Sequence, residues 1–519
     1  MKVNVPLMEK KSLPMPAFYA ALGMAVSYYL LPILISISVA ETVILGFLLA
    51  FISVISFLRA AYFFLEKDSS GFFYKAVIIV LSLGLGFVMG IASRGNVTDS
   101  IETSIPRESV IAVRGILRED PRSLQSGSGL GILEIHGCSG LGGLRASARG
   151  NLTVFFPQET IMHLKDFGRG SEIYIDGKLS SGKRGVSFGA VSVHVIKPAP
   201  FVERFRTLLR KVLIDRINSP AKQKGDGFLN YGSAGSPVWS GFASALILGV
   251  RDDLDTELAE SFRNSGCAHI LALSGMHLAI ISGILAFLLR RPLGIKPASL
   301  VGALFILFYV FLIGAQASLV RSAIMYLIGA FSIWSMVKGK SLSLLAMAFI
   351  VQLIFQGGGG ESLSFILSYL ALAGILVLGK SFRSLLQGRL PDIISGSLSA
   401  SLGAFIMTAP VVAFCFGSLK PVGILAGIVI APLSSIFMVL SLAALAVSFF
   451  SAPLWNFFDF ILTQVYRFLE LVVNSTGRVP GLTVSNPFAV VGFSVIVGIL
   501  ILLLDKHDTA RRKSIASFN

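Results

Sequence analysis

Long apolar runs, separated by short polar segments, dominate the pattern of the chain. A helix needs about 20 apolar residues to cross the hydrocarbon core of a bilayer, with a range of roughly 17–25. The runs that meet or approach this length are 17–37, 41–58, 75–92, 268–289, 298–314, 318–336, 342–356, 363–379, 397–417, 421–448 and 487–504. They predict a polytopic α-helical membrane protein with about 10–11 transmembrane helices.

Segment 454–474 has a mixed pattern. Its apolar side chains fall on one helical face, whereas Asp459, Arg467 and Glu470 are polar. This pattern is typical of a helix that lies at the membrane interface, and equally of a span that faces a polar cavity. Both alternatives remain open from the sequence.

Residues 109–196 alternate apolar and polar positions and carry many glycines. The predicted strands are 109–118, 130–137, 151–156, 171–179 and 186–196. Five strands with glycine-rich connections favour a small all-β, OB-like barrel, inserted after the third span. Such barrels often bind single strands through stacking aromatics and a basic groove. The candidates here are Phe155, Phe156, Tyr174, Phe188, Arg145, Arg149, Lys183 and Arg184. The alternative is that the aromatics form the core and the charges lie in solvated loops.

Beyond this domain, residues 201–217 have the spacing of an amphipathic helix, and 218–237 form a linker containing Gly, Ser and Pro. The sequence therefore predicts N-terminal membrane helices over 1–92, a β-domain over 93–200, an amphipathic helix and linker over 201–237, a membrane domain over 238–505 and a basic tail over 506–519.

Composition supports burial in lipid, since 54% of the residues are hydrophobic and only 14% are charged. That is too few charges to coat a wholly soluble protein. The net charge of +16 reflects topology, because lysines and arginines fall in every second loop. This alternation places both termini in the cytoplasm and the β-domain outside. The three cysteines are far apart and form neither a metal-binding pair nor a disulfide framework.

The densest polar cluster near the membrane runs from 246 to 277. The apolar stretch 238–250 is too brief to span, so it is predicted to be re-entrant or to line a cavity. Asp252 and Asp253 follow it, and either brace the structure, paired with a neighbouring arginine, or coordinate a cation. A short helix then ends at Ser265-Gly266. The next predicted helix enters the membrane with His269, Ser274 and His277.

His269 and His277 would lie about 12 Å apart along one helix, too far apart to share a metal ion. Ser274 and His277 are three residues apart and can touch. A Ser–His pair alone does not make a hydrolase, since neither an oriented acid nor an oxyanion donor is evident. Three interpretations remain: tight packing at Ser274 and Gly275, a polar pathway lining, and catalysis.

Arg321 lies near the start of an apolar span. A charge within a span is costly and faces protein or water rather than lipid. Arg321 therefore either extends to the interface or faces a cavity, where it would pair with a phosphate or carboxylate.

Gly374–Ser381 matches the spelling of a phosphate-binding loop. The middle of the segment is four large apolar residues at the end of a span, without the strand–loop–helix context that such a loop needs. We therefore predict no nucleotide site and no other cofactor.

Several ordered blocks resemble the ComEC family of bacterial competence proteins, the DNA-uptake channels of the inner membrane. The most specific is the run from Ser265 to His277, and weaker blocks follow in the family's order. These are Ala245–Gly249, Gly314–Met325, Leu363–Ala371, Thr408–Pro410, Phe416-Gly417 and Ala431–Leu433. Together they cover residues 240–450.

The resemblance implies a channel, not an enzyme, for uptake of single-stranded DNA during natural transformation. The expected pathway lining is His269, Ser274, His277 and Arg321, with Asp252, Asp253, Gly266 and Gly275 as structural or cation-associated residues. The expected partners are single-stranded DNA, membrane lipid, a DNA receptor, a helicase-like motor and a separate nuclease. Weaker expected DNA contacts in the exterior domain are Arg145, Arg149, Phe155, Lys183 and Arg184.

Two features depart from the family pattern. Some members have a cysteine pair in the exterior loop, whereas only Cys138 is present here. Many members carry a C-terminal metallo-β-lactamase-like domain, whereas this chain ends soon after its last predicted span, and its six histidines never form a His-x-His-x-Asp-His ligand run. A nuclease within this chain is therefore not expected. The alternative function is a membrane exporter that kept the fold but not the substrate, and a membrane-embedded hydrolase is a more distant third.

Overall fold

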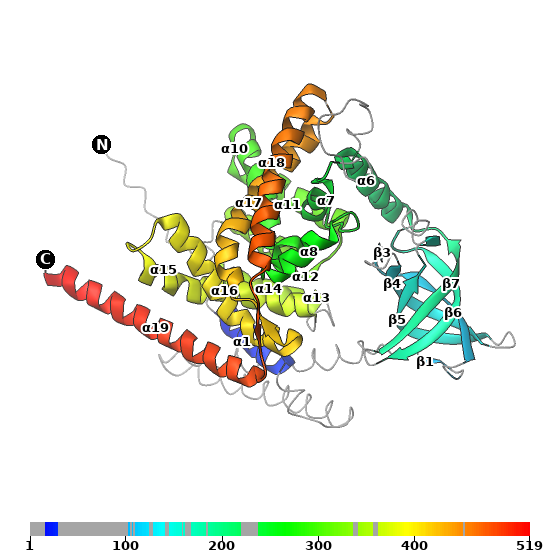
Figure 1. Cartoon of the computed structure of the whole chain (residues 1–519), viewed down its shortest axis with the longest axis horizontal. Coiled ribbons are helices and arrows are strands. Elements are labelled where there is room, and N and C mark those ends of the chain that lie inside the picture. Colours follow the sequence, from blue (N-terminus) through cyan, green and yellow to red (C-terminus); the bar gives the residue numbers. More distant parts are fainter. Residues whose placement is uncertain are drawn as a thin grey trace. The chain divides into compact units, whose positions relative to one another are not determined.

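The computed structural model describes residues 16–29, 102–103, 106, 109–123, 128–140, 145–157, 159–160, 168–182, 185–218, 237–335, 341–355, 362–449 and 452–518. The chain forms two compact units, each built from segments that are distant in the sequence (Figure 1). One unit comprises residues 1–94, 257–440 and 464–519, and the other comprises residues 95–256 and 441–463.

The predicted β-domain is a closed five-stranded barrel. Its strands are β2 (Val110–Leu117), β4 (Gly129–Gly140), β5 (Arg145–Phe156), β6 (Glu172–Gly182) and β7 (Gly185–Lys197). They pair in the order β5-β7-β6-β2-β4, and an additional β4–β5 pairing closes the barrel. Only β5 and β7 pair in parallel among these strands. This is OB-like topology, as the sequence predicted, with two short added strands, β1 (Glu102–Thr103) and β3 (Arg122–Ser123).

Alternating side chains fill the barrel. Every second residue of the strands points inward, so the core gathers Leu133, Leu152, Val154, Ile173 and Ile175 with other buried apolar residues. Gly115 and Gly177 follow register shifts in β2 and β6. A Cβ at Gly177 would overlap the carbonyl oxygen of Gly189. The glycines therefore allow the sharp strand bending that closes so small a barrel.

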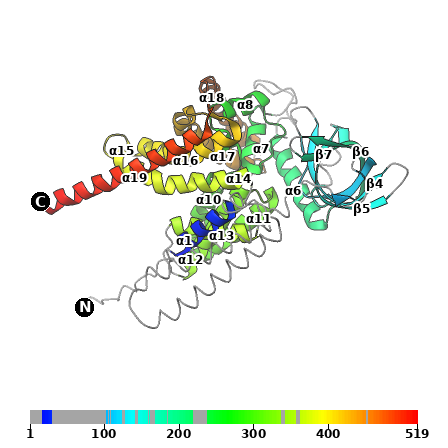
Figure 2. The ribbon, with the colours of Figure 1, turned by 90° about the horizontal axis from the view of Figure 1, so that it is seen from below.

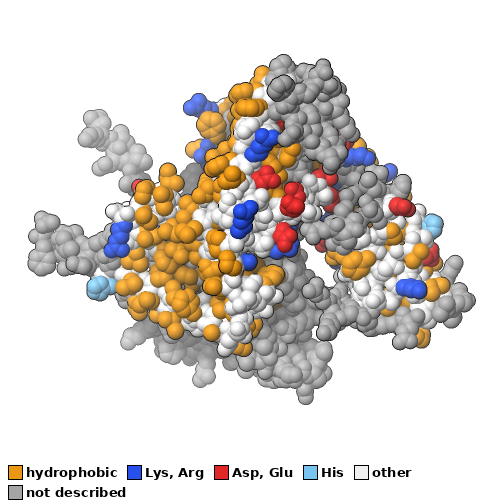
Figure 3. All heavy atoms as spheres, viewed as in Figure 1, with side chains coloured by type: hydrophobic (Ala, Val, Ile, Leu, Met, Phe, Trp, Pro, Cys, Tyr) orange, Lys and Arg blue, Asp and Glu red, His pale blue; other side chains and the backbone are white. Residues whose placement is uncertain are grey.

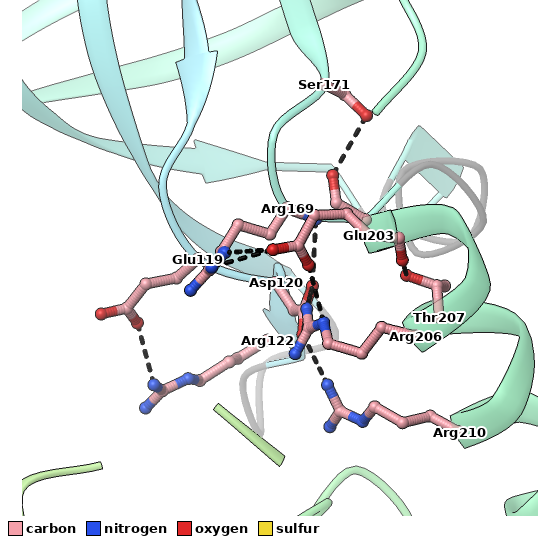
Figure 4. Close-up of polar contacts among 10 residues, drawn as sticks. Glu119, Asp120, Arg122, Arg169, Ser171, Glu203, Arg206, Thr207 and Arg210 are labelled. Atoms are coloured by element: carbon pink, nitrogen blue, oxygen red, sulfur yellow. Dashed lines mark hydrogen bonds and ion pairs between the residues drawn. The ribbon is translucent and has the colours of Figure 1, made fainter. Parts of the chain in front are cut away.

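Helix α6 (Phe201–Asn218) is joined to the end of the barrel by a partly buried ion cluster (Figure 4). The Asp120 carboxylate, in the loop after β2, accepts hydrogen bonds from Arg206, from Arg210 and from the backbone N–H of Arg169. Glu203 accepts from Arg169 and Arg206, at 2.8 Å in each case. The predicted amphipathic helix therefore has its charged face locked to the barrel.

Helix α7 (Ser240–Leu248) is the short apolar stretch that the sequence left between two interpretations, and all nine of its residues are buried. Trp239, just before it, donates a hydrogen bond of 2.8 Å to Asp459 and packs 5.8 Å from the ring of Trp455. Both partners lie in the first half of α18 (Ala452–Gly477). Segment 454–474, ambiguous from its pattern, is therefore part of one continuous helix.

Seven helices among the described residues are long and apolar enough to cross a membrane. They are α10 (Gly275–Leu293), α11 (Ile295–Ile313), α12 (Ala317–Ser335), the continuous segment Leu363–Leu386, α16 (Asp392–Phe416), α17 (Val422–Val447) and residues Pro487–Asp505 of α19 (Pro487–Phe518). Hydrophobic side chains cover much of the visible surface of these helices (Figure 3). The protein is thus a polytopic α-helical membrane protein with an inserted β-barrel, as predicted.

The remaining predicted spans fall partly inside and partly outside the described residues. Helix α13 (Ser341–Phe355) is apolar but shorter than the seven, and α1 (Pro16–Tyr29) packs against it (Figure 2). The predicted spans 41–58 and 75–92 lie outside the described residues. The domain boundaries and the sidedness proposed from the sequence stay predictions.

One helical prediction is wrong. His269, Ser274 and His277 do not share a helix, because α9 (Ala268–Leu271) stops and α10 starts only at Gly275. Ala272 and Ser274 are extended at the break. Ser274 then caps α10, which a continuous helix would not allow. Just before α9, helix α8 (Thr256–Asn264) is followed by Gly266, whose backbone is in the left-handed region with φ +74. The Ser265-Gly266 sequence predicted this helix stop.

The segment that spells a phosphate-binding loop is helical throughout. Helix α14 (Leu363–Gly374) continues through a π-helical turn (Ile375–Gly379) into α15 (Lys380–Leu386). Its glycines serve packing: a Cβ at Gly403 of α16 would lie 2.5 Å from the Gly374 carbonyl oxygen and 2.7 Å from the Gly379 nitrogen. The segment therefore has no free loop amides to hold a phosphate, as expected.

Candidate functional site

Arg321 is a buried cation inside the membrane-spanning helices. It lies in the first turns of α12 and is only 7% exposed. Its Nη1 donates a hydrogen bond to the carbonyl oxygen of Ser368 on α14, and its guanidinium carbon lies 5.8 Å from the ring centroid of Tyr369. Among the described residues no carboxylate pairs with it, and its Nε has no hydrogen-bond partner. A buried charge without a counter-ion is costly, so this position demands a compensating group.

A polar network behind Arg321 fixes the helices that surround it. The Tyr369 hydroxyl donates to Gln352 Oε1 at 2.7 Å, and Gln352 Nε2 donates to the carbonyl oxygen of Ala317 at 2.9 Å. The Ser368 hydroxyl donates to the Ser318 hydroxyl at 2.9 Å. These bonds tie α12, α13 and α14 together, and satisfied polar networks of this kind give membrane helices a unique packing. The carbonyl that receives Arg321 is therefore held in place.

The start of α10 presents a second buried donor. The backbone N–H of Ser274 donates to His277 Nδ1 at 3.0 Å, and the Ser274 hydroxyl also lies 3.0 Å from that nitrogen. Since an amide N–H can only donate, Nδ1 is an acceptor, and a neutral ring then carries its hydrogen on Nε2. His277 is 1% exposed, and its Nε2 has no partner among the described residues.

Gly275 brings these two donors to the same helix terminus. A Cβ at Gly275 would lie 2.6 Å from the Ser322 hydroxyl and 3.1 Å from Arg321 Nη2. The guanidinium therefore lies against the first turn of α10, where the helix dipole is positive. Two positive groups side by side repel each other unless an anion lies with them, and a helix N-terminus with a cation beside it is the usual form of an oxyanion site. The arrangement suits a phosphate or carboxylate.

His269 does not join this cluster. It is exposed on α9, and its ring interacts with the backbone of Gly266. Gly266 itself is a packing residue, since a Cβ there would come 2.9 Å from the carbonyl oxygen of Lys420. The expected lining residues thus divide: Ser274, His277 and Arg321 come together at the start of α10, and His269 stands apart.

Asp252 and Asp253 lie on the exposed turn after α7. Asp252 is close enough to Arg210 to favour its charged form, and the backbone of Asp253 packs against Gly241. The bracing role considered for the pair stays a prediction. No group of three or more potential metal-ligating side chains occurs within the described part of the chain.

The aromatic residues proposed as DNA contacts on the barrel differ in their exposure. Phe155 is exposed on β5, whereas Phe156 and Phe188 are buried in the core and unable to stack on a base. Tyr174 is half-buried. Arg145 and Arg149 lie on β5, but their side chains, like Lys183 and Arg184, fall outside the described part of the structure. The exposed Arg114 and Arg118 are each paired with a glutamate.

No role was predicted for Ser368 and Tyr369, which contact Arg321, or for Gln352, which bonds Tyr369. One signal was available, since a glutamine inside an apolar run is costly unless it is bonded. The Asp120 cluster was missed as well, because Asp120 is 49, 86 and 90 positions away from its partners Arg169, Arg206 and Arg210.

Comparisons with known proteins agree with this architecture. Residues 246–508 match the family model described as Competence protein. The chain is 26% identical over 278 residues to "ComE operon protein 3" of Bacillus subtilis (strain 168), covering 52% of this chain and 34% of that protein. It is 33% identical over 196 residues to an "Uncharacterized protein" of Aquifex aeolicus (strain VF5), covering 37% of this chain and 45% of that one.

The matched region thus spans less than half the length of either relative. No solved structure matches. The family model covers half of the chain, including every membrane-spanning helix described above. The chain belongs to the Competence protein family.

Proposed function

We propose that this protein is a passive channel for uptake of single-stranded DNA through the inner membrane during natural transformation. The observation that carries the proposal is the buried guanidinium of Arg321, which lies at the start of α10 without a carboxylate partner among the described residues. The proposal places the barrel on the exterior side and both termini in the cytoplasm.

The physical demand on such a channel is to replace the hydration of a polyanion. A DNA strand carries one negative charge per nucleotide, and lipid cannot solvate that charge. Arg321 Nε and His277 Nε2 are buried donors without partners in the described structure. His277 belongs to the first turn of α10, and the Arg321 guanidinium lies against that turn. A passing phosphate would accept these hydrogen bonds and neutralise the guanidinium.

Hydrolysis fits the same residues less well. In a serine hydrolase the histidine accepts the serine proton, while an acid orients the other ring nitrogen. Here His277 Nδ1 already accepts the backbone N–H of Ser274, and no described carboxylate bonds to Nε2. The Ser274–His277 pair therefore acts as a helix cap that positions a donor, and the proposed role needs no cofactor.

The other assignments are part of the same proposal. His269 would meet the strand before the buried cluster, and Phe155, with the basic residues of β5 and of the turn after β6, would receive it on the barrel. A DNA receptor, a helicase-like motor and a separate nuclease would supply capture, energy and degradation of the second strand.

The test is DNase-protected import of labelled DNA in a deletion strain and in its complemented strain. We expect the deletion to abolish protected label while surface-bound label stays at the wild-type level, and complementation to restore import. Protected label at the wild-type level in the deletion strain would contradict the proposal and favour an exporter of another substrate.

A further inference from the structure

Helix α6 carries an exposed apolar stripe. Phe201, Phe205, Leu208 and Val212 are 74%, 49%, 60% and 41% exposed. They follow one another at intervals of four, three and four residues, so they form a single ridge along the helix. A ridge of four large apolar side chains is costly to leave in water.

The opposite face of α6 fixes the direction of this stripe. Glu203, Arg206 and Arg210 point into the Asp120 cluster at the end of the barrel (Figure 4). Arg206 is only 3% exposed in this cluster. Because the charged face is bonded to the barrel, the apolar stripe is directed away from it.

Basic residues flank the stripe. Arg204 and Lys211 are exposed along one side, and Arg216 is exposed on the other. The Arg216 guanidinium lies 5.0 Å from the ring centroid of Phe449, two residues beyond the end of α17, a membrane-spanning helix. The C-terminal end of α6 therefore lies beside the end of a helix that is long and apolar enough to span a membrane.

We propose that α6 lies in the interface of a bilayer containing anionic phospholipid and holds the barrel on the membrane surface. Its apolar stripe enters the boundary between headgroups and acyl chains, and the flanking basic residues contact lipid phosphates. An apolar ridge with cationic edges, beside the end of a membrane-spanning helix, is the pattern of an in-plane membrane helix. The proposal is independent of what the channel carries.

The test uses the full chain in nanodiscs of phosphatidylethanolamine and phosphatidylglycerol, with a spin label at Leu208→Cys. The matched control is Val191→Cys, an equally apolar and 74% exposed position on the barrel. Both variants carry Cys415→Ser, which removes the exposed native thiol, since Cys138 and Cys267 are buried. Burial also raises the pKa of Cys267 to about 11, which keeps that thiol unreactive at neutral pH.

We expect the label at 208 to be more accessible to oxygen than to a water-soluble nickel chelate, and the label at 191 to show the reverse. Replacing phosphatidylglycerol by phosphatidylcholine should shift the label at 208 toward water. A label at Phe205→Cys repeats the measurement if the first variant is not recovered. Nickel accessibility at 208 equal to that at 191 would overturn the proposal. Spin–spin broadening at 208 that vanishes on dilution with unlabelled protein would also overturn it, because a second copy would then cover the stripe.

Discussion

Arg321 of α12 donates a hydrogen bond to the backbone carbonyl oxygen of Ser368 on α14. A carbonyl oxygen carries only a partial charge and cannot neutralise a guanidinium in a low-dielectric interior. The contact orients the side chain and leaves its charge available. The predictions about DNA import follow from this uncompensated charge at Arg321.

Gly275 tests whether the position of the guanidinium matters. In Gly275→Ala the new methyl group would meet the Ser322 hydroxyl and Arg321 Nη2, so the guanidinium must move. We expect DNA import to fall although no functional group is lost, and Ser322→Ala to restore part of it. Gly283→Ala is the matched control on the same helix, because nothing lies within 4 Å of its Cβ position. Import that is equally affected by both alanine variants would argue against a role for geometry at Gly275.

The glycine contact between α14 and α16 predicts a stability effect. A Cβ in Gly403→Ala would overlap the backbone of Gly374, which cannot move aside as a side chain can. We expect a loss of about 1–3 kcal/mol in the free energy of unfolding, the usual cost of overpacking, measured as a lower melting temperature of the purified protein. Gly396→Ala in the same helix, with open space at its Cβ, should melt like the wild type.

Residues 374–381, whose sequence matches a phosphate-binding loop motif, give a functional prediction. Lys380 is exposed at the start of α15 and follows a helical turn rather than a loop. We expect Lys380→Ala to leave DNA import unchanged and the purified protein to show no saturable ATP binding. Loss of import together with ATP binding that depends on Lys380 would refute this view of the segment.

Acid should loosen α6 from the barrel. Burial raises the pKa of Asp120, but Arg206 and Arg210 lower it by more, so the folded value lies below the ordinary 3.8. The stabilisation is therefore complete above the unfolded value and is lost as the pH falls through about 4. Asp120→Asn should cost about 1.5–3 kcal/mol at pH 7, since Arg206 and Arg210 each lose a charged partner while Arg206 keeps its ion pair with Glu203.

The measurement is the difference in melting temperature between wild type and Asp120→Asn as a function of pH, which should shrink below pH about 4. Glu119→Gln is the control, because its carboxylate pairs with the exposed Arg122, and an exposed ion pair contributes little to stability. A difference that is constant with pH would show that the charge of Asp120 contributes nothing.

The proposed sidedness rests on the alternation of basic loops. On a Cys415→Ser background, Ser147→Cys on the barrel should react with a membrane-impermeant maleimide in intact spheroplasts. His507→Cys, in the basic tail, should react only after permeabilisation. Both positions are exposed, so access to reagent decides the outcome. Labelling of the tail before permeabilisation would reverse the proposed topology.

The parts of the fold that the sequence predicted are those with a local cause. Strand alternation predicted the five barrel strands, because one face of each strand is buried. Long apolar runs predicted the spans. The break before Gly275 was missed, because Ala272 and Leu273 are apolar and hide it, although Ser274 is a common N-cap residue.

The candidate site was predicted only in part for a similar reason. Arg321 was found because a charge in an apolar run is conspicuous by itself. Its environment was not, since Ser368 and Tyr369 reach it from another helix through tertiary packing. The contact between Arg321 and Gly275 also depends on how α10 and α12 pack, which no local pattern specifies.

The most direct test of the central claim is DNA import by Arg321→Ala. Losing a hydrogen-bonded charge costs about 1.5–3 kcal/mol, which corresponds to a roughly ten- to hundredfold loss of DNase-protected label. Surface-bound DNA and the amount of protein in the membrane should stay unchanged. Arg290→Ala, an exposed arginine in the last turn of α10, should import normally. Wild-type import by Arg321→Ala would contradict the account.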